Sequence, residues 1–254
     1  GIRDVLGSRG LGDVYKRQLY DHVSEAFEAL NEGEEKLKRS IELGVGQLKI
    51  GVSSTLCKYM LLPYLKEFIH RNPHISISIE CQSTNETLKL LDDDKIDIGL
   101  IGKPASLKTF NFYYLDNIED IFVTTKDYLR NLSARGVKKS EILQNSTLML
   151  LDKGNMTRKY IDDYLQENQI HVKDSIDISN MDLLIDFAKI GVGVACVIKS
   201  IVSKELADGT LIEIPLGIPI HKREVGFAYK ESSKLSTSLQ TFIKFYESYT
   251  PEDF

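Results

Sequence analysis

The chain has 254 residues, of which 42% are hydrophobic and 27% charged, a composition typical of a soluble α/β protein with one large or two modest domains. Its 32 Lys and Arg against 37 Asp and Glu give a net charge of −5, which argues against a basic nucleic-acid surface, so we do not expect this chain to bind DNA on its own. No tract is apolar enough to span a bilayer and no secretory signal pattern opens the chain, so we expect a cytoplasmic protein without membrane contact.

Cysteines and histidines provide no recognisable chemical site. The cysteines at 57, 81 and 196 are too scattered for a disulfide framework, and the five histidines lack metal-ligand spacing and a companion nucleophile. We therefore expect free thiols, no metal site, no cofactor and no enzyme activity. Cys57 falls in the first turn of an expected helix, where a lowered pKa would suit oxidant sensing, but a buried, inert thiol is the interpretation we favour.

Residues 1–18 (GIRDVLGSRGLGDVYKRQ) differ from everything that follows, because they are glycine-rich and show neither helical nor strand periodicity. They resemble translated adaptor or vector sequence, and we leave them out of the fold prediction as a non-native segment. A native flexible arm is the alternative.

Residues 19–43 have the pattern of a helix with a narrow apolar stripe, and Gly44 and Gly46 are suited to ending it. A narrow stripe over that length favours packing against a partner helix, so residues 19–45 are predicted to be a linker helix that dimerises. An ordinary surface helix docked on its own domain is the alternative. The stripe consists of Leu19, Val23, Ala26, Phe27, Leu30, Leu37 and Ile41.

The first half of the remaining chain repeats a strand followed by a helix. Residues 48–52 predict a strand, and residues 56–71 an amphipathic helix. A strand at 75–79 leads into a helix opened by Ser83 or Thr84 as N-cap. Residues 96–102 are almost entirely apolar, which predicts a central parallel strand. This β-α-β-α-β order implies right-handed crossovers and a doubly wound, Rossmann-like sheet.

The second half restarts the same alternation after two extended strands at 112–115 and 121–125. Two sets of β-α units joined by crossover strands predict two lobes, residues 46–120 with 222–250 and residues 121–221, with a binding cleft between them. The other expected elements are strands at 146–151, 176–178, 194–198, 211–214 and 224–229, helices at 159–168, 183–190, 199–206 and 235–246, and a polar turn at 152–158.

Four segments of the chain match patterns of one family in order and spacing. Residues 46–51 fit G-x-L-x-I-G, residues 62–73 fit L-P-x-x-x-x-F-x-x-x-x-P, residues 91–100 fit L-x-x-x-x-x-D-x-x-[IL], and residues 191–195 fit G-x-G-[VI]-[AG]. On these segments, residues 19–249 resemble the linker helix and effector-binding domain of a LysR-type transcriptional regulator. The resemblance extends over about nine-tenths of the chain.

The resemblance implies a fold like that of periplasmic solute-binding proteins, used as a sensor of a small, frequently anionic effector. It also implies a homodimer or homotetramer. Family members carry a winged helix-turn-helix before the linker helix, and we expect that domain to be missing here, so that DNA is contacted only through the missing part.

Candidate effector contacts are hydroxyl, amide, glycine and lysine residues that end strands or open helices, where backbone N–H groups and the helix dipole favour anions. Each could instead simply cap its own helix. Relatives often show G-S-G-T-R at 154–158, from which Asn155-Met156 departs, so anion binding at that turn is the weaker half of the site. The candidates are Ser53, Ser54, Thr55, Ser83, Thr84, Gly102, Lys103, Thr125, Asn155, Thr157, Ser179 and Asn180.

Two other functions share this fold. A solute-binding protein of a transporter is the first alternative, and a signal peptide or lipobox in its reading frame would favour it. An enzyme on the same scaffold is the second, since fold alone does not fix function, but it would need an acid, base or nucleophile in the cleft.

Overall fold

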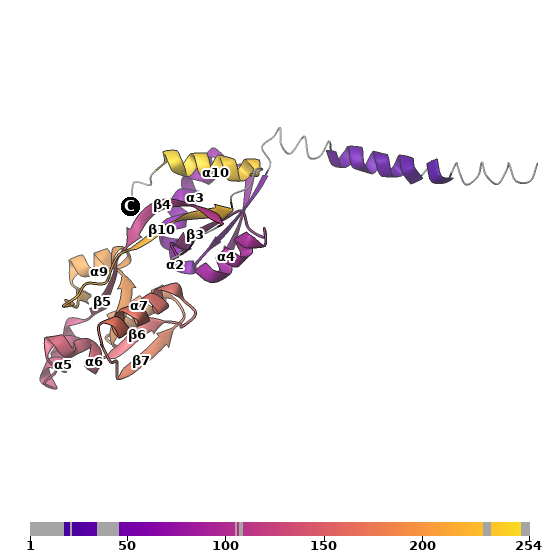
Figure 1. Ribbon diagram of the computed structural model, residues 1–254. Coiled ribbons are helices and arrows are strands. Elements are labelled where there is room, and N and C mark those ends of the chain that lie inside the picture. Colours follow the sequence, from indigo (N-terminus) through magenta and orange to yellow (C-terminus); the bar gives the residue numbers. More distant parts are fainter. Residues whose placement is uncertain are drawn as a thin grey trace, which may run out of the picture.

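Two α/β lobes form the body of the molecule, as the sequence predicts (Figure 1). Each lobe is built around a five-stranded mixed sheet. The computed structural model describes residues 18–20, 22–34, 46–104, 106, 109–230 and 235–249. Residues 18–20 and 22–34 are helical, in agreement with the apolar stripe. The segment 1–17 and the expected end of the linker helix at 35–45 lie outside the described residues.

Lobe I contains the first sheet, with strand order β2-β1-β3-β10-β4. β1 pairs in parallel with β2 and β3, while β10 runs antiparallel between β3 and β4. The apolar strand expected to be central and parallel, β3, is the middle strand of the sheet, but it is parallel only to β1 and antiparallel to β10. The strands are β1 (Gly46–Val52), β2 (Ile75–Cys81), β3 (Ile98–Gly102), β4 (Phe110–Ile118) and β10 (Arg223–Lys230).

One continuous helical stretch follows β1, made of α2 (Ser54–Leu56), the π-helical turn η1 (Cys57–Leu61) and α3 (Leu62–Arg71). The other helices of lobe I are α4 (Thr84–Asp92) and α10 (Thr237–Ser248). The helix expected at 56–71 therefore begins two residues earlier, because Ser53 accepts a hydrogen bond from the Leu56 N–H and caps it.

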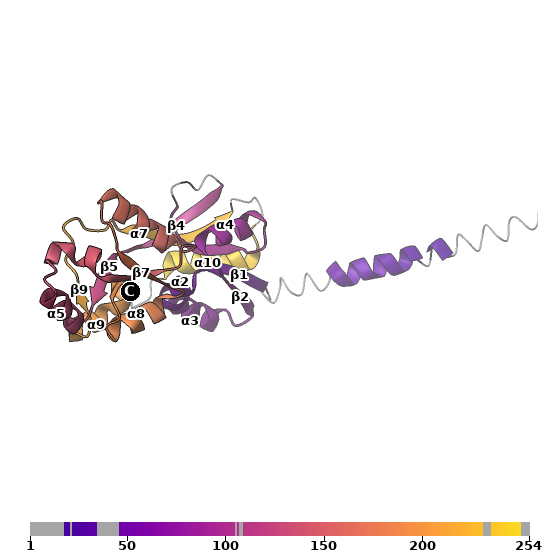
Figure 2. The ribbon, with the colours of Figure 1, turned by 90° about the horizontal axis from the view of Figure 1, so that it is seen from below.

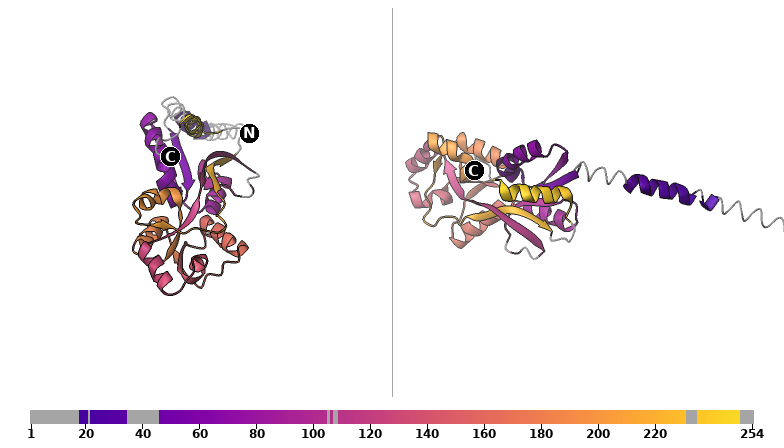
Figure 3. Two further views of the ribbon diagram at one scale, coloured as in Figure 1. Left: turned by 90° about the vertical axis from the view of Figure 1, so that its left-hand side faces the viewer. Right: turned by 90° about the horizontal axis from the view of Figure 1, so that it is seen from above.

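An aromatic cluster fixes α10 to lobe I. The ring of Phe242 lies 4.9 Å from Phe68 of α3, edge to face, and 5.2 Å from Phe227 of β10. Tyr246 stacks on Phe227 at 4.6 Å. These contacts hold α10, the last helix, against lobe I, and Figure 3 shows α10 (yellow) lying along that lobe.

Lobe II contains the second sheet, with strand order β7-β6-β8-β5-β9. β6 pairs in parallel with β7 and β8, and β5 runs antiparallel to β8 and β9. Its core is formed by fully buried strand residues such as Phe122 and Leu148. The strands are β5 (Asp120–Thr124), β6 (Thr147–Leu151), β7 (Asp174–Ile178), β8 (Val194–Ile198) and β9 (Ile212–Glu213).

The helices of lobe II differ from the prediction mainly between β5 and β6 and at the start of α7. The tract between β5 and β6 forms helical segments that the sequence analysis did not predict, because α5 is strongly polar and buries only Leu132. α7 begins at Met156 rather than Lys159, because Asn155 caps it. The helical segments are α5 (Lys126–Ala134), η2 (Lys139–Glu141), α6 (Ile142–Asn145), α7 (Met156–Glu167), α8 (Met181–Lys189), η3 (Lys199–Val202) and α9 (Ser203–Asp208).

The chain passes between the lobes twice, from β4 directly into β5 and from β9 through residues 214–222 into β10. Figure 2 shows the lobes side by side with these crossings between them. None of the helices in the described residues has both the length and the apolar character required to cross a membrane. The two crossings hold the lobes next to each other, and the candidate site lies between them, beside both crossings.

Candidate ligand-binding cleft

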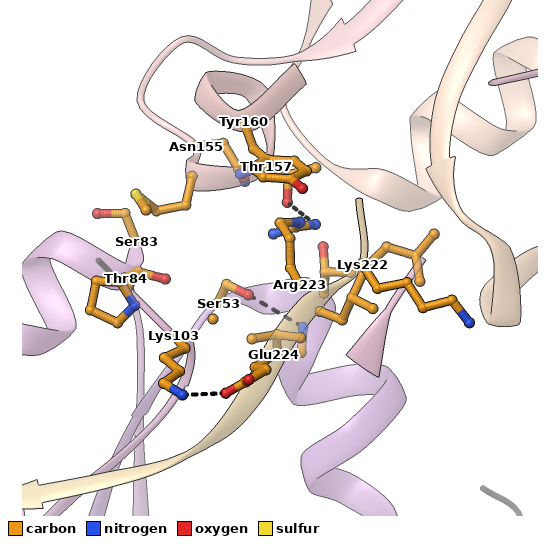
Figure 4. Close-up of a pocket in the computed structure, with 17 residues that line it drawn as sticks. Ser53, Ser83, Thr84, Lys103, Asn155, Thr157, Tyr160, Lys222, Arg223 and Glu224 are labelled. Atoms are coloured by element: carbon orange, nitrogen blue, oxygen red, sulfur yellow. Dashed lines mark hydrogen bonds and ion pairs between the residues drawn. The ribbon is translucent and has the colours of Figure 1, made fainter. Parts of the chain in front are cut away.

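A cavity of about 450 Å³ lies between the two lobes and is bordered by both crossings (Figure 4). A volume of this size is in the range of small-molecule sites. Eight of the twelve candidate residues line it: Ser53, Thr55, Ser83, Thr84, Gly102, Lys103, Asn155 and Thr157. The other lining residues are Leu56, Pro104, Ile118, Met156, Tyr160, Ile198, Lys222, Arg223 and Glu224.

Lobe I contributes two helix N-termini. Ser53 Oγ accepts a hydrogen bond from the Leu56 N–H at 3.3 Å and is therefore the helix cap, while Thr55 faces the cavity. Ser83 Oγ caps α4 in the same way by accepting from the Glu86 N–H at 3.3 Å, and the largely buried Thr84 lies beside it. Uncapped N–H groups and the dipoles of both helices therefore point toward the cavity.

Lobe II contributes a third helix N-terminus, at α7. Asn155 Oδ1 accepts from the Thr157 N–H at 2.8 Å, and Thr157 Oγ1 accepts from Arg223 Nη2 at 3.2 Å. The departure from the G-S-G-T-R pattern therefore keeps a capped helix start beside the cavity. Arg158, the next residue, points away and holds Asp177 and the Leu151 carbonyl.

Four candidates do not line the cavity. Ser54 is exposed on the outside of its helix. Thr125 caps α5 and follows the last residue of β5. Because β5 runs antiparallel to β8, it is the first residue of β5 that lies on the cavity side, and Thr125 lies at the far end of the strand. Ser179 and Asn180 follow β7, the outermost strand, and Asn180 Oδ1 caps α8 by accepting from the Leu183 N–H at 2.9 Å.

Arg223 is the main lining residue that the sequence analysis missed. Its Nε donates to Asp120 Oδ2 at 2.7 Å and its Nη2 to Asp120 Oδ1 at 2.9 Å. The Asp120 side chain is fully buried, and that burial raises its pKa while Arg223 opposes the rise. The guanidinium also lies 5.2 Å from the Tyr160 ring centroid.

Two further charged lining residues flank Arg223 in the sequence. Glu224 forms an ion pair with Lys103 on the cavity wall. Lys222 Nζ lies 3.1 Å from Glu119 Oε2, and Lys199 contacts the same carboxylate at 3.1 Å. Hydrogen bonds from Lys222 and Lys199 lower the pKa of Glu119. One sequence signal could have identified Arg223: the acidic pair Glu119-Asp120 lies in one crossing and the basic pair Lys222-Arg223 in the other.

Charge and dipoles together give the cavity an electrostatic preference. Three cationic side chains and three helix N-termini border it, against the single carboxylate of Glu224. An anion is therefore favoured, and hydroxyl groups from both lobes are placed to donate hydrogen bonds to it. Among the described residues, no cluster of three or more His, Cys, Asp or Glu is arranged to hold a metal ion.

The Cys57 thiol is poorly suited to oxidant sensing. Burial raises its pKa, and the neighbouring Cys81 raises it further. The dipole at this helix start therefore does not produce the lowered pKa that was considered for it, and the thiolate is disfavoured.

Comparison with known proteins identifies this architecture. The profile of the LysR substrate binding domain matches residues 42–250. The uncharacterized HTH-type transcriptional regulator YeiE of Escherichia coli (strain K12) is 23% identical over 243 residues, which span 95% of this chain and 80% of YeiE.

Solved structures of regulatory domains share the fold. The CcmR regulatory domain of Synechocystis PCC6803, in complex with 2-PG, superposes with a TM-score of 0.66 at 19% identity, covering 79% of this chain and 95% of that domain. The effector binding domain of QuiR, in complex with shikimate, gives 0.64 at 16% identity, covering 79% and 94%. At these identities the likeness establishes the fold.

Proposed function

The chain belongs to the LysR substrate-binding domain family, the effector-binding part of LysR-type regulators, and we propose that its inter-lobe cavity binds a small anionic metabolite. The observation that carries this proposal is the convergence of three helix N-termini with Lys103, Lys222 and Arg223 on one cavity of about 450 Å³. The rest of the wall combines hydroxyl and apolar side chains with the Asn155 amide and the Glu224 carboxylate. This combination suits a compact organic anion better than a long apolar ligand.

The cavity residues come from both lobes, so a bound anion would contact both at once. Thr84 and Lys103 belong to lobe I, whereas Asn155 and Thr157 belong to lobe II. A ligand that bridges the lobes binds most tightly to one lobe arrangement and shifts the population toward it. We propose that this shift is the signal that the regulator reads.

A thermal-shift screen tests the binding proposal. The chain is heated with inorganic sulfate, inorganic phosphate, shikimate or a series of small dicarboxylates, and glycerol serves as the neutral control. An anion present at about 100 times its Kd adds about 2.7 kcal/mol to the stability of the folded state, which corresponds to a Tm rise of roughly 5 °C or more. If no anion raises the Tm, or if glycerol raises it equally, the proposal fails.

A matched pair of lysine variants locates the site. Lys103→Gln removes a cation from the cavity wall and should weaken the response to the best anion. Lys89→Gln removes a lysine from α4 that pairs with Glu86 at 2.6 Å and does not line the cavity, so it should leave the response unchanged. Equal responses of the two variants would place the anion elsewhere.

We propose that the protein acts in the cytoplasm as a regulator and not as an enzyme. DNA contact would belong to a separate DNA-binding domain, since a net charge of −5 disfavours the approach of this chain to DNA phosphates. We also propose the domain limits 46–120 with 222–250 for lobe I and 121–221 for lobe II. The similarity to transcriptional regulators lends no support to a transporter solute-binding protein.

We propose a homodimer as the working assembly, on the basis of two exposed apolar faces. The α8 face in lobe II consists of Leu183, Phe187 and Ile190 of the helix region and Ile176 of β7. The α3 face in lobe I consists of Leu62 and Ile69 of α3 and Ile79 of β2. Each face thus combines a helix with the outermost strand of a sheet.

A two-fold arrangement covers both faces with a second copy of the chain. If the α3 face of one protomer packs on the α8 face of its partner, the symmetry repeats the contact and closes the assembly. The unpaired edges of β2 and β7, which would otherwise invite non-specific pairing, are then protected. The exposed Phe27 and Leu30 of the linker helix would provide a separate contact through which dimers could form a homotetramer.

A further inference from the structure

One cluster of side chains outside the cavity joins the two lobes directly. Lys58 Nζ of η1 lies 2.7 Å from Asp182 Oδ1 of α8, and the Tyr59 hydroxyl donates to the same oxygen at 2.5 Å. Lys58 and Tyr59 belong to lobe I, and Asp182 belongs to lobe II. The contact therefore exists only when the lobes stand close together.

The lobe I half of this cluster is coupled to the cavity by the backbone. η1 continues without interruption from the helix start at Ser53, and both Ser53 and Thr55 line the cavity. The turn that carries Lys58 and Tyr59 is π-helical, a local widening that is found mainly at functional positions. A displacement of the helix start by a ligand would therefore move Tyr59 with it.

The lobe II half is coupled to the exposed α8 face. Asp182 stands in the first turn of α8, and Leu183 and Phe187 of the same helix belong to that face. A rotation of lobe II that changes the distance between Asp182 and Tyr59 must also reorient the apolar residues of α8. One short rigid helix thus connects the inter-lobe contact with the surface proposed to meet a second protomer.

We propose that Lys58, Tyr59 and Asp182 form an inter-lobe latch, which stabilises the closed lobe arrangement and transmits occupancy of the cavity to α8. This inference rests on the proposed effector function for its signal, but the latch itself exists without a ligand. The Lys58–Asp182 pair is about half exposed, so its contribution is modest. A modest contribution suits a switch, because a ligand can then shift the equilibrium between open and closed lobes.

Hydrogen–deuterium exchange of the ligand-free chain tests the latch. Asp182→Asn and Tyr59→Phe each remove part of it and keep the side-chain volume. The reporter is the segment 155–160, which lines the cavity at the start of α7 and holds none of the altered residues. We expect roughly two- to five-fold faster exchange there in both variants, as loss of a weak surface contact predicts.

Asp186→Asn is the matched control, because Asp186 lies on the same helix and its ion-pair partner, Lys189 at 3.8 Å, is in the same lobe. It should leave exchange at 155–160 unchanged. If Asp182→Asn and Tyr59→Phe accelerate exchange only at their own positions, or if the control matches them, the latch is refuted. An asparagine amide oxygen can still accept from the Tyr59 hydroxyl, so Tyr59→Phe in the Asp182→Asn background should accelerate exchange at 155–160 further.

A second arm separates this inference from the effector proposal. Inorganic sulfate at saturating concentration should slow exchange at 155–160 in the wild-type chain, and its apparent Kd should rise roughly two- to five-fold in Asp182→Asn. If sulfate and the other screened anions protect nothing, the binding proposal fails while the ligand-free result still decides the latch. If sulfate binds equally well to both chains, the transmission of occupancy by the latch is refuted.

Discussion

Arg223 and Asp120 join the two strands by which the chain crosses between its lobes. Arg223 is the first residue of β10 and Asp120 the first of β5, and the guanidinium donates to both carboxylate oxygens at 2.7 and 2.9 Å. A further hydrogen bond reaches Thr157 at the start of α7. One partly buried cation therefore joins the two crossings, orients a helix N-terminus and borders the cavity.

Arg223→Ala should strongly destabilise the chain. The substitution leaves the fully buried Asp120 without its partner, and breaking such a pair costs about 3–5 kcal/mol. Urea unfolding measures the loss. Arg130→Ala, which breaks an exposed pair with Asp127, is the control and should cost less than about 1 kcal/mol. A loss for Arg223→Ala as small as that of the control would mean that the hinge does not depend on this pair.

Glu224→Gln should tighten anion binding. In the wild-type chain Glu224 competes with an incoming anion for Lys103 and adds a negative charge to the cavity wall. Removal of that charge frees Lys103, and we expect a roughly two- to ten-fold lower Kd for the best anion of the screen, measured by calorimetry at low salt.

Glu86→Gln is the control, since it neutralises a carboxylate in an equivalent pair outside the cavity. An unchanged or higher Kd for Glu224→Gln would indicate that Glu224 accepts a hydrogen bond from the ligand, and the simple charge argument would be wrong.

Glu119→Gln should flatten the acid side of the stability profile. Lys222 and Lys199 hold the pKa of Glu119 below its ordinary value of 4.5 in the folded state, whereas the unfolded chain has the ordinary value. The ionised carboxylate therefore stabilises the fold above that ordinary pKa, and the contribution is lost as the pH falls through the lowered folded pKa.

Urea unfolding at several pH values between about 5 and 3 measures this effect. The free energy of unfolding should fall less steeply with pH in Glu119→Gln than in the wild-type chain. Glu167→Gln, on the exposed side of α7, should leave the slope unaltered. Parallel profiles for wild type and Glu119→Gln would contradict the prediction.

Gly193→Ala should destabilise lobe II. A Cβ at this position would lie 2.2 Å from the Thr147 carbonyl oxygen, so β8 would have to move away from β6. We expect a loss of about 3 kcal/mol in urea unfolding, at the upper end for overpacking. Gly154→Ala is the control, because no other group lies within 4 Å of the position that its methyl group would occupy, and it should change stability by less than about 0.5 kcal/mol. Equal effects would show that the strand contact can relax.

The sequence predicted the elements whose residues carry strong periodicity. Strands such as β3 and β8 are almost continuously apolar, and α3 and α10 keep a clear helical stripe, so their positions followed from burial alone. α5 was missed because its apolar stripe is short: Tyr128, Leu129 and Leu132 pack on the core of lobe II, and only Leu132 is buried in an otherwise polar helix. Asn155 was predicted to lie in a turn because the residues that follow it, Met156 to Arg158, show no apolar pattern. Its side chain is nevertheless the N-cap of α7.

The site was only half predictable for a different reason. Helix N-termini can be read locally, and that reading placed Ser53, Ser83 and Asn155 beside the cavity. Which strand ends lie together depends on the order and direction of the strands in the sheet. Because β5 is antiparallel to β8, Thr125 lies at the end of β5 that is far from the cavity. Arg223 lies in a charged run that resembles a solvated loop, and only the tertiary contact with Asp120 distinguishes it.

Phe187→Glu should prevent assembly of the proposed homodimer. Phe187 lies on the α8 face, between Leu183 and Ile190 in the sequence, and a buried carboxylate without a partner in the interface would cost more than the contact gains. Analytical ultracentrifugation of the chain measures the mass. We expect a dimer for the wild type and a monomer for Phe187→Glu. Ile218→Glu is the matched control, because Ile218 is an exposed isoleucine of lobe II that belongs to neither face, and it should remain dimeric. If Phe187→Glu sediments as the wild type does, the α8 face is not the interface, and the linker helix becomes the remaining contact to test.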